Sequence, residues 1–256
     1  MALFHKVLAS IGIGNAKVDT KLEKASYTAG EIMSGVVEVT GGTVEQQIDS
    51  IYLSVMTTYT REMDDKKVTD QTAVFKRKLN EPFTIGADEK REFQFDLELP
   101  HETPVTLGKT RIWVETGLDI KQAVDPGDTD YIEVRATPIA EAVLNTVRSL
   151  GFRLREVECQ QASRLVRGKY PFVQEFEFVP VSGSYKGKLD ELEVTFLTQS
   201  KDEVTILLQV DKKARGLGGL LSEAMGTDEK NVRLRVNKVD LPTLESKLNR
   251  SISQFS

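Results

Sequence analysis

The stretch from residue 18 to residue 39 constrains the fold more than any other part of the sequence. Residues on one face alternate with polar residues before a turn at Ala29-Gly30, and the alternation resumes after Gly35. Such a period of two is typical of a half-buried β-strand. Two strands joined by a short turn form an antiparallel pair. The stretch therefore predicts two antiparallel strands, with Val18, Thr20, Leu22, Val37 and Val39 at the alternating positions.

The same alternation recurs along most of the chain and predicts an all-β protein. It appears at residues 51–59, 93–99, 112–118 and 131–134, and again at 176–178, 192–196, 204–210 and 232–236. Turn residues between these segments indicate antiparallel connections. The strands fall into two sets, and the segment between the sets has a different period.

This middle segment has helical spacing. Apolar residues recur every three or four positions from Ile139 to Leu150, Thr137 can cap the first turn, and Gly151 can end the helix. A helix between two sets of strands indicates two domains. The predicted parts are an N-terminal β-sandwich at 1–136, a connecting helix at 137–151 and a C-terminal β-sandwich at 152–256.

Helical spacing also predicts a short helix at each end of the chain, at 2–11 and 241–254. The first could anchor the chain to a membrane surface or a partner, or it could dock on its own domain. Docking is favoured, because one basic residue, Lys6, attracts anionic lipid only weakly. The second helix has an apolar stripe that must be buried, made of Leu244, Leu248, Ile252 and Phe255.

Composition argues against several classes of function. The formal net charge is −5, whereas nucleic-acid-binding domains usually carry a basic excess. Cys159 is the only cysteine, so no disulfide can form within the chain, which is typical of a reducing cytoplasm. A run of about 18 apolar residues, as needed for a membrane-spanning helix, does not occur. We therefore expect a cytoplasmic protein that does not bind nucleic acid.

No residue pattern indicates catalysis, a metal or a cofactor. His5 and His101 are the only histidines, and a zinc site of the usual cysteine and histidine type cannot be assembled from them with one cysteine. The glycine-rich segment 215–221 lacks the spacing of a phosphate-binding loop. We predict a non-enzyme without cofactor, metal or catalytic residue, and the alternative is an enzyme whose pocket the sequence does not reveal.

Two acidic segments favour structural interpretations. Asp125, Asp128 and Asp130 lack the ligand spacing of a calcium loop, so a solvated hairpin turn is expected. The acidic residues at 190–194 alternate with apolar ones, as an exposed strand face requires. They could instead form cross-strand ion pairs with Arg233 and Arg235.

One loop is a candidate binding surface for a partner protein. The loop follows a predicted strand and combines lysine and arginine side chains with leucines. Leucines in such a loop are expected to be partly exposed to solvent. Cations can steer a partner, and exposed leucines can then anchor it. A plain flexible loop and short helix is the interpretation that the sequence favours, and the binding surface is the alternative. The candidate residues are Lys212, Lys213, Arg215, Leu217, Leu220 and Leu221.

Two resemblances add to these observations. The order of strand, Tyr-x-x-Gly-Glu, glycine and strand within 18–39 resembles the first strands of arrestin-like domains. Over nearly its full length the chain resembles the bacterial sporulation-control proteins of the stage 0 M type. The segments that carry this second resemblance are 4–24, 150–162, 171–180, 189–197 and 210–221. Where that family often has Asp-Arg-Arg, this chain has Asp211-Lys212-Lys213, which keeps the charge but loses the bidentate geometry of arginine.

These resemblances imply two arrestin-like sandwiches and a regulatory scaffold or adaptor. Such a protein would act through contacts with other proteins in early sporulation and in cell-cycle or division decisions. The implied partners are sporulation, division or cytoskeletal regulators, and a homo-oligomer is compatible with the sequence. The alternative from a different class is a membrane-surface module held by the helix at 2–11.

Overall fold

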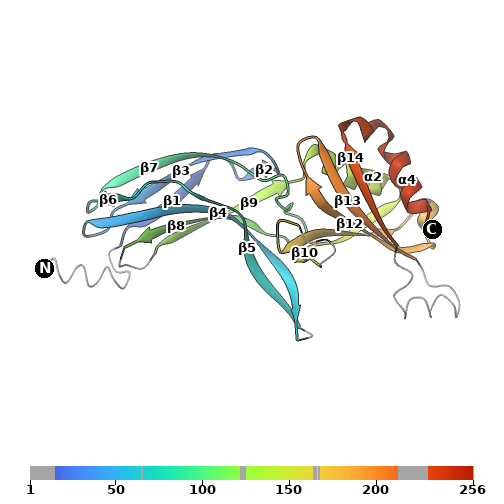
Figure 1. Ribbon diagram of the computed structural model, residues 1–256, viewed down its shortest axis with the longest axis horizontal. Coiled ribbons are helices and arrows are strands. Elements are labelled where there is room, and N and C mark those ends of the chain that lie inside the picture. Colours follow the sequence, from blue (N-terminus) through green and yellow to red (C-terminus); the bar gives the residue numbers. More distant parts are fainter. Residues whose placement is uncertain are drawn as a thin grey trace. The chain divides into compact units, whose positions relative to one another are not determined.

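The computed structural model describes residues 15–64, 66–121, 125–163, 166, 168–212 and 230–255, and most of them form β-strands (Figure 1). The predicted all-β class is therefore confirmed. The predicted helix at 2–11 lies outside the described residues. The chain divides into two compact units.

The first unit is a β-sandwich. It comprises residues up to Thr58 together with Gln71–Thr103 and Arg111–Arg135. One sheet has the strand order β1-β3-β7, and the other is built on β4, β8, β9 and β2, with β5 and β6 also paired to β4. The strands are β1 (Lys17–Leu22), β2 (Ser26–Thr28), β3 (Ile32–Thr40), β4 (Gln46–Met63), β5 (Lys66–Lys78), β6 (Phe83–Ile85), β7 (Lys90–Glu98), β8 (Ile112–Ile120) and β9 (Gly127–Arg135).

The strand pair predicted at 18–39 forms β1 and β3. The two strands are antiparallel, with Val18 opposite Val39 and Thr20 opposite Val37. Gly30, in the turn before β3, has φ +85°, which L side chains rarely adopt. Alternation thus places Val37 and Val39 in the core, where both are fully buried.

The second unit places two helices against an antiparallel sheet. It comprises Tyr59–Asp70, Pro104–Thr110 and the chain from Ala136 onward. Its sheet has the order β14-β13-β12-β11-β10. The elements are α2 (Pro138–Ser149), β10 (Phe152–Gln161), β11 (Phe172–Pro180), η1 (Gly183–Tyr185), β12 (Leu189–Gln199), β13 (Glu203–Lys212), β14 (Lys230–Asn237), η2 (Lys238–Thr243) and α4 (Leu244–Ser253).

The core of the second unit lies between this sheet and the helices α2 and α4. Val143 and Val147 of α2, and Leu248 of α4, are fully buried against strand residues such as Ile206 and Leu208. The predicted burial of the C-terminal stripe is confirmed, because Leu244 and Ile252 are also buried and Phe255 packs against the same core. The helix predicted as a connection therefore also supplies core residues to the second unit.

The ends of α2 follow the predicted signals. The Thr137 hydroxyl oxygen accepts a hydrogen bond from the backbone N–H of Ala140 at 3.3 Å. Gly151 follows the helix with φ +96°, and a Cβ there would lie 2.4 Å from the carbonyl oxygen of Ser182. Only glycine fits this position without strain. The chain can therefore turn directly from α2 into β10.

Candidate interaction surface

The predicted partner-binding loop can be placed only at its first residue. Lys212 is the last residue of β13. The other candidates, Lys213, Arg215, Leu217, Leu220 and Leu221, lie outside the described residues. Their role as a binding surface stays a prediction.

An exposed apolar turn lies at the other end of the β13–β14 pair, where Glu203 is opposite Asn237. It is η2, called the η2 turn below. Two of its apolar side chains face solvent, because Val239 is 83% exposed and Leu241 is 37% exposed. Within the described residues, Val239 is the most exposed of the large apolar side chains in the second unit. The helical spacing does not predict this turn, since it places the start of a helix at residue 241.

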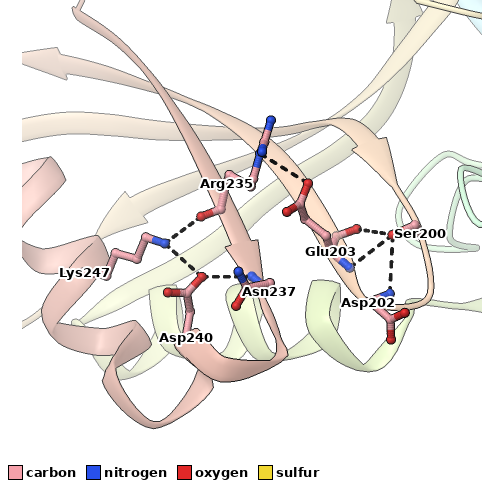
Figure 2. Close-up of polar contacts among 7 residues, drawn as sticks. All are labelled: Ser200, Asp202, Glu203, Arg235, Asn237, Asp240 and Lys247. Carbon is pink, nitrogen blue, oxygen red and sulfur yellow. Dashed lines mark hydrogen bonds and ion pairs between the residues drawn. The ribbon is translucent and has the colours of Figure 1, made fainter.

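The η2 turn is held by reciprocal hydrogen bonds, of which Figure 2 shows the one between Asp240 and Asn237. The Asp240 carboxylate accepts from the backbone N–H of Asn237 at 3.0 Å, and the Asn237 side chain accepts from the N–H of Val239 at 3.1 Å. This is a capping box, which satisfies backbone donors at the start of a helical turn. The spacing Asn-x-x-Asp at 237–240 is the sequence signal that could have revealed it.

Lys247 of α4 fastens the η2 turn to the sheet and the helix. Its ammonium group lies 3.0 Å from the Asp240 carboxylate and donates to the carbonyl oxygen of Arg235 at 2.6 Å (Figure 2). The N–H of Asn237, and then Lys247, lower the pKa of Asp240 below its ordinary value. The charged carboxylate is therefore the form that this network stabilises.

Two ion pairs lie beside the η2 turn. Arg235 contacts Glu203 at 3.2 Å, and Lys238 contacts Asp202 at 2.6 Å. The Ser200 hydroxyl accepts from the N–H of Glu203 at 3.1 Å and so fixes the tip of the β12–β13 hairpin (Figure 2). Charged side chains in and next to the η2 turn are thus already paired with opposite charges.

The alternative interpretation of the acidic segment at 190–194, cross-strand ion pairs with Arg233 and Arg235, is wrong. β13 lies between β12 and β14, so the two groups are not on neighbouring strands. Arg235 pairs instead with Glu203, and Glu191 accepts a hydrogen bond from Arg155 at 2.5 Å. Alternation identified the exposed faces correctly, but it carries no information on strand order.

The acidic segment at 125–130 is not simply a solvated turn. Asp125 lies in the turn, where it accepts from the N–H of Ile120 at 3.0 Å. Asp128 and Asp130 belong to β9 and are only partly exposed. Among the described residues, no group of three or more His, Cys, Asp or Glu side chains is placed to hold a metal ion.

His101 packs against a glycine turn, and Cys159 is buried. A Cβ on Gly30 would lie 2.6 Å from the Nε2 atom of His101, so the imidazole packs directly on that glycine. Cys159 is buried, with its Sγ atom 3.8 Å from the hydroxyl oxygen of Thr110. His5 is outside the described residues. No helix within the described residues is sufficiently long and apolar to span a membrane.

Comparison with known proteins gives a consistent result. The family model described as SpoOM protein matches residues 4–214. The sporulation-control protein Spo0M of Bacillus subtilis is 42% identical over 259 residues, covering 100% of both chains. Its crystal structure matches with a TM-score of 0.85 over 95% of this chain and 100% of that chain. The chain therefore belongs to the Spo0M family.

Proposed function

We propose that the protein is a non-enzymatic regulatory scaffold or adaptor that acts through contacts with other proteins. Its full-length relative is named as a sporulation-control protein, which supports a regulatory role in sporulation for this chain too. The proposed partners are regulators of sporulation, of division or of the cytoskeleton. The observation that carries the proposal is the η2 turn, which presents Val239 and Leu241 to solvent.

A rigid apolar turn is suited to protein binding. Ordering a flexible loop on binding costs conformational entropy, and the hydrogen bonds of the η2 turn have already fixed its backbone. Burying a Val or Leu side chain completely contributes roughly 1.5–3 kcal/mol. Polar groups around an apolar centre are also typical of interfaces. The ion pairs beside the turn fit this arrangement.

The loop that begins at Lys212 is proposed as a second contact. Val210 is opposite Lys230 at the loop end of the β13–β14 pair, and Glu203 is opposite Asn237 at the other end. The loop and the η2 turn are therefore carried by the same pair of strands. Charge in the loop would steer the partner, and the η2 turn would anchor it.

The test of the η2 turn is a double substitution, Val239→Asp with Leu241→Asp, in a deletion strain of a spore-forming host. We expect sporulation frequency to remain at the level of the deletion, because two buried charges oppose docking. The urea midpoint should change little for Val239→Asp alone, since Val239 is 83% exposed, and this single variant separates docking from the stability that the mostly covered Leu241 contributes. Ile32→Asp is the matched control, because Ile32 is 59% exposed but belongs to the first unit. Full complementation by the double variant would contradict the proposed surface.

The test of the scaffold mechanism compares charges with reactive groups. Charge reversal at Lys212, Lys213 and Arg215 should reduce complementation, whereas Cys159→Ser and His101→Gln should preserve it. A scaffold depends on its surfaces and not on a single acid, base or nucleophile. Loss of complementation by His101→Gln at unchanged stability, with full activity after charge reversal, would favour an enzyme instead.

A further inference from the structure

The strand β1 of the first unit is joined to the opposite sheet through Thr20. β1 pairs with β3 in its own sheet. The backbone N–H of Thr20 donates to the Asp128 carboxylate on β9 at 2.7 Å, and the hydroxyls of Thr20 and Thr116 lie 2.7 Å apart. Both threonines are buried. The Asp128 carboxylate thus bridges β1 and β9, and the boundary between these two strands is called the seam below.

A second carboxyl group lies beside this contact. Asp128 and Asp130 are two positions apart on β9 and so share a face, and the Asp128 carboxylate acts on the Asp130 carboxyl group. The buried Oδ2 atom of Asp130 has no hydrogen-bond partner within the described residues. Two carboxyl groups can form a hydrogen bond with one another only when the pair holds a proton.

The groups around the pair add negative charge. From β1, Asp19 acts on Asp130, while Lys21 is engaged by Asp19 at 3.7 Å and by Glu38 at 3.4 Å. From β8, the residues opposite the pair are Thr116 and Val114, which do not titrate. Burial first, then Asp128 and then Asp19 raise the pKa of Asp130 to about 6. Ionising both carboxyl groups would place a charge on a buried oxygen beside a like charge.

We propose that the Asp128–Asp130 pair is a proton-dependent latch that holds β1 against β9. When the pair holds a proton, Asp130 donates to Asp128, and Asp128 can still accept from the N–H of Thr20. When both groups are ionised, they repel one another, and the buried Oδ2 atom of Asp130 gains water when the seam opens. The seam then loosens, and the backbone of β1 becomes accessible to solvent.

The direction of the pH effect follows from comparing the closed and open seam. In the open seam Asp130 is solvated and has its ordinary pKa of 3.8, whereas in the closed seam the pKa is about 6. Below both values the latch contributes fully. Between the two pKa values, rising pH removes the proton from Asp130 only in the open form, so the free energy of opening falls. Above both pKa values Asp130 is ionised in both forms, and the free energy of opening no longer changes with pH. Because the pair is partly exposed, solvent screening limits the total effect to about tenfold.

Hydrogen exchange at the Thr20 amide, followed by NMR from pH 4 to pH 7.5, tests the latch. After correction for the chemical exchange rate, protection should fall about tenfold in the full chain and level off above pH 6. In Asp130→Asn it should stay constant, because the amide donates to Asp128 at every pH. Glu133→Gln is the matched control on the exposed face of β9 and should behave as the parent. Constant protection in the parent, or an unchanged loss in Asp130→Asn, would overturn the proposal.

A measurement on the unsubstituted protein remains decisive if Asp130→Asn does not fold. The carboxyl carbon of Asp130 should titrate near pH 6, and the amide signal of Thr20 should shift with the same midpoint. A midpoint near the ordinary value for aspartate, or a Thr20 signal that does not follow Asp130, would refute the latch.

Discussion

At the scale of single residues, Gly30 and His101 show which contacts sequence reasoning can and cannot find. The turn at Ala29-Gly30 could be predicted, because a glycine follows an alternating segment and glycine adopts positive φ easily. Gly30 does have a positive φ in the structure. The packing of His101 on Gly30 could not, since the two residues are distant in the chain. A lone histidine therefore turns out to fill space beside a turn that only glycine can form.

Tyr185 is a buried residue whose hydroxyl group is hydrogen bonded to Asn249. It donates to the side-chain oxygen of Asn249 at 2.5 Å and lies 3.1 Å from its carbonyl oxygen. Burial raises the pKa of this phenol above its ordinary value. The hydroxyl thereby links η1 to α4.

Replacing Tyr185 by phenylalanine should lower the free energy of unfolding by about 1 kcal/mol. The substitution removes the hydroxyl donor, so the Asn249 oxygens lose a hydrogen-bond partner. Urea unfolding of the full chain measures the effect. Tyr131→Phe is the control, since Tyr131 is 68% exposed. Equal stability of both variants would show that the Tyr185 hydroxyl contributes nothing.

At the scale of elements, the helices could be predicted better than the strand neighbours. The stripe of α4 appears in the sequence as a period near 3.6, and Leu244, Leu248 and Ile252 are all buried. The period of β14 is equally clear, yet nothing in it specifies β13 as its partner. Periodicity records which face is buried, whereas pairing depends on the order of strands in space. For this reason the sequence could not show that Arg235 pairs with Glu203 on β13 and not with the segment at 190–194.

The helix α4 should be essential for the stability of the second unit. Leu248 is fully buried in the core, so Leu248→Ala should lower the free energy of unfolding by about 2–5 kcal/mol. Ser246→Ala, on the exposed face of the same helix, should change it by less than about 0.5 kcal/mol. If Leu248→Ala left stability unchanged but abolished self-association, the stripe would be an interface instead.

At the scale of the whole molecule, the compact units have different boundaries from the predicted domains. The second unit recruits Tyr59–Asp70 and Pro104–Thr110 from the first half of the sequence. The Gln174 side chain accepts from the N–H of Val105 at 2.9 Å and donates to its carbonyl at 2.8 Å. The backbone N–H of Lys109 donates to Val157 at 3.2 Å. Alternation could not reveal this, because both recruited segments are separated in the sequence from the strands that they meet.

A fragment that begins at residue 137 should therefore be less stable than the same residues in the full chain. It lacks Val105, which belongs to the core of the second unit, and it leaves Gln174 without these partners. Circular dichroism during urea unfolding should give a lower midpoint for the fragment. The same midpoint in both would indicate that the recruited segments contribute no stability. Gln174→Ala in the full chain tests the hydrogen bonds separately from the loss of Val105.

The position of Lys247 also bears on aggregation. β14 is the outermost strand of its sheet among the described residues, and an outermost strand exposes backbone groups with which another chain can pair. The ammonium group of Lys247 already occupies the carbonyl oxygen of Arg235. An incoming strand would have to displace this cation and break its ion pair with Asp240. Lys247, which fixes the η2 turn, thus also protects the edge strand β14 against pairing with a strand from another chain.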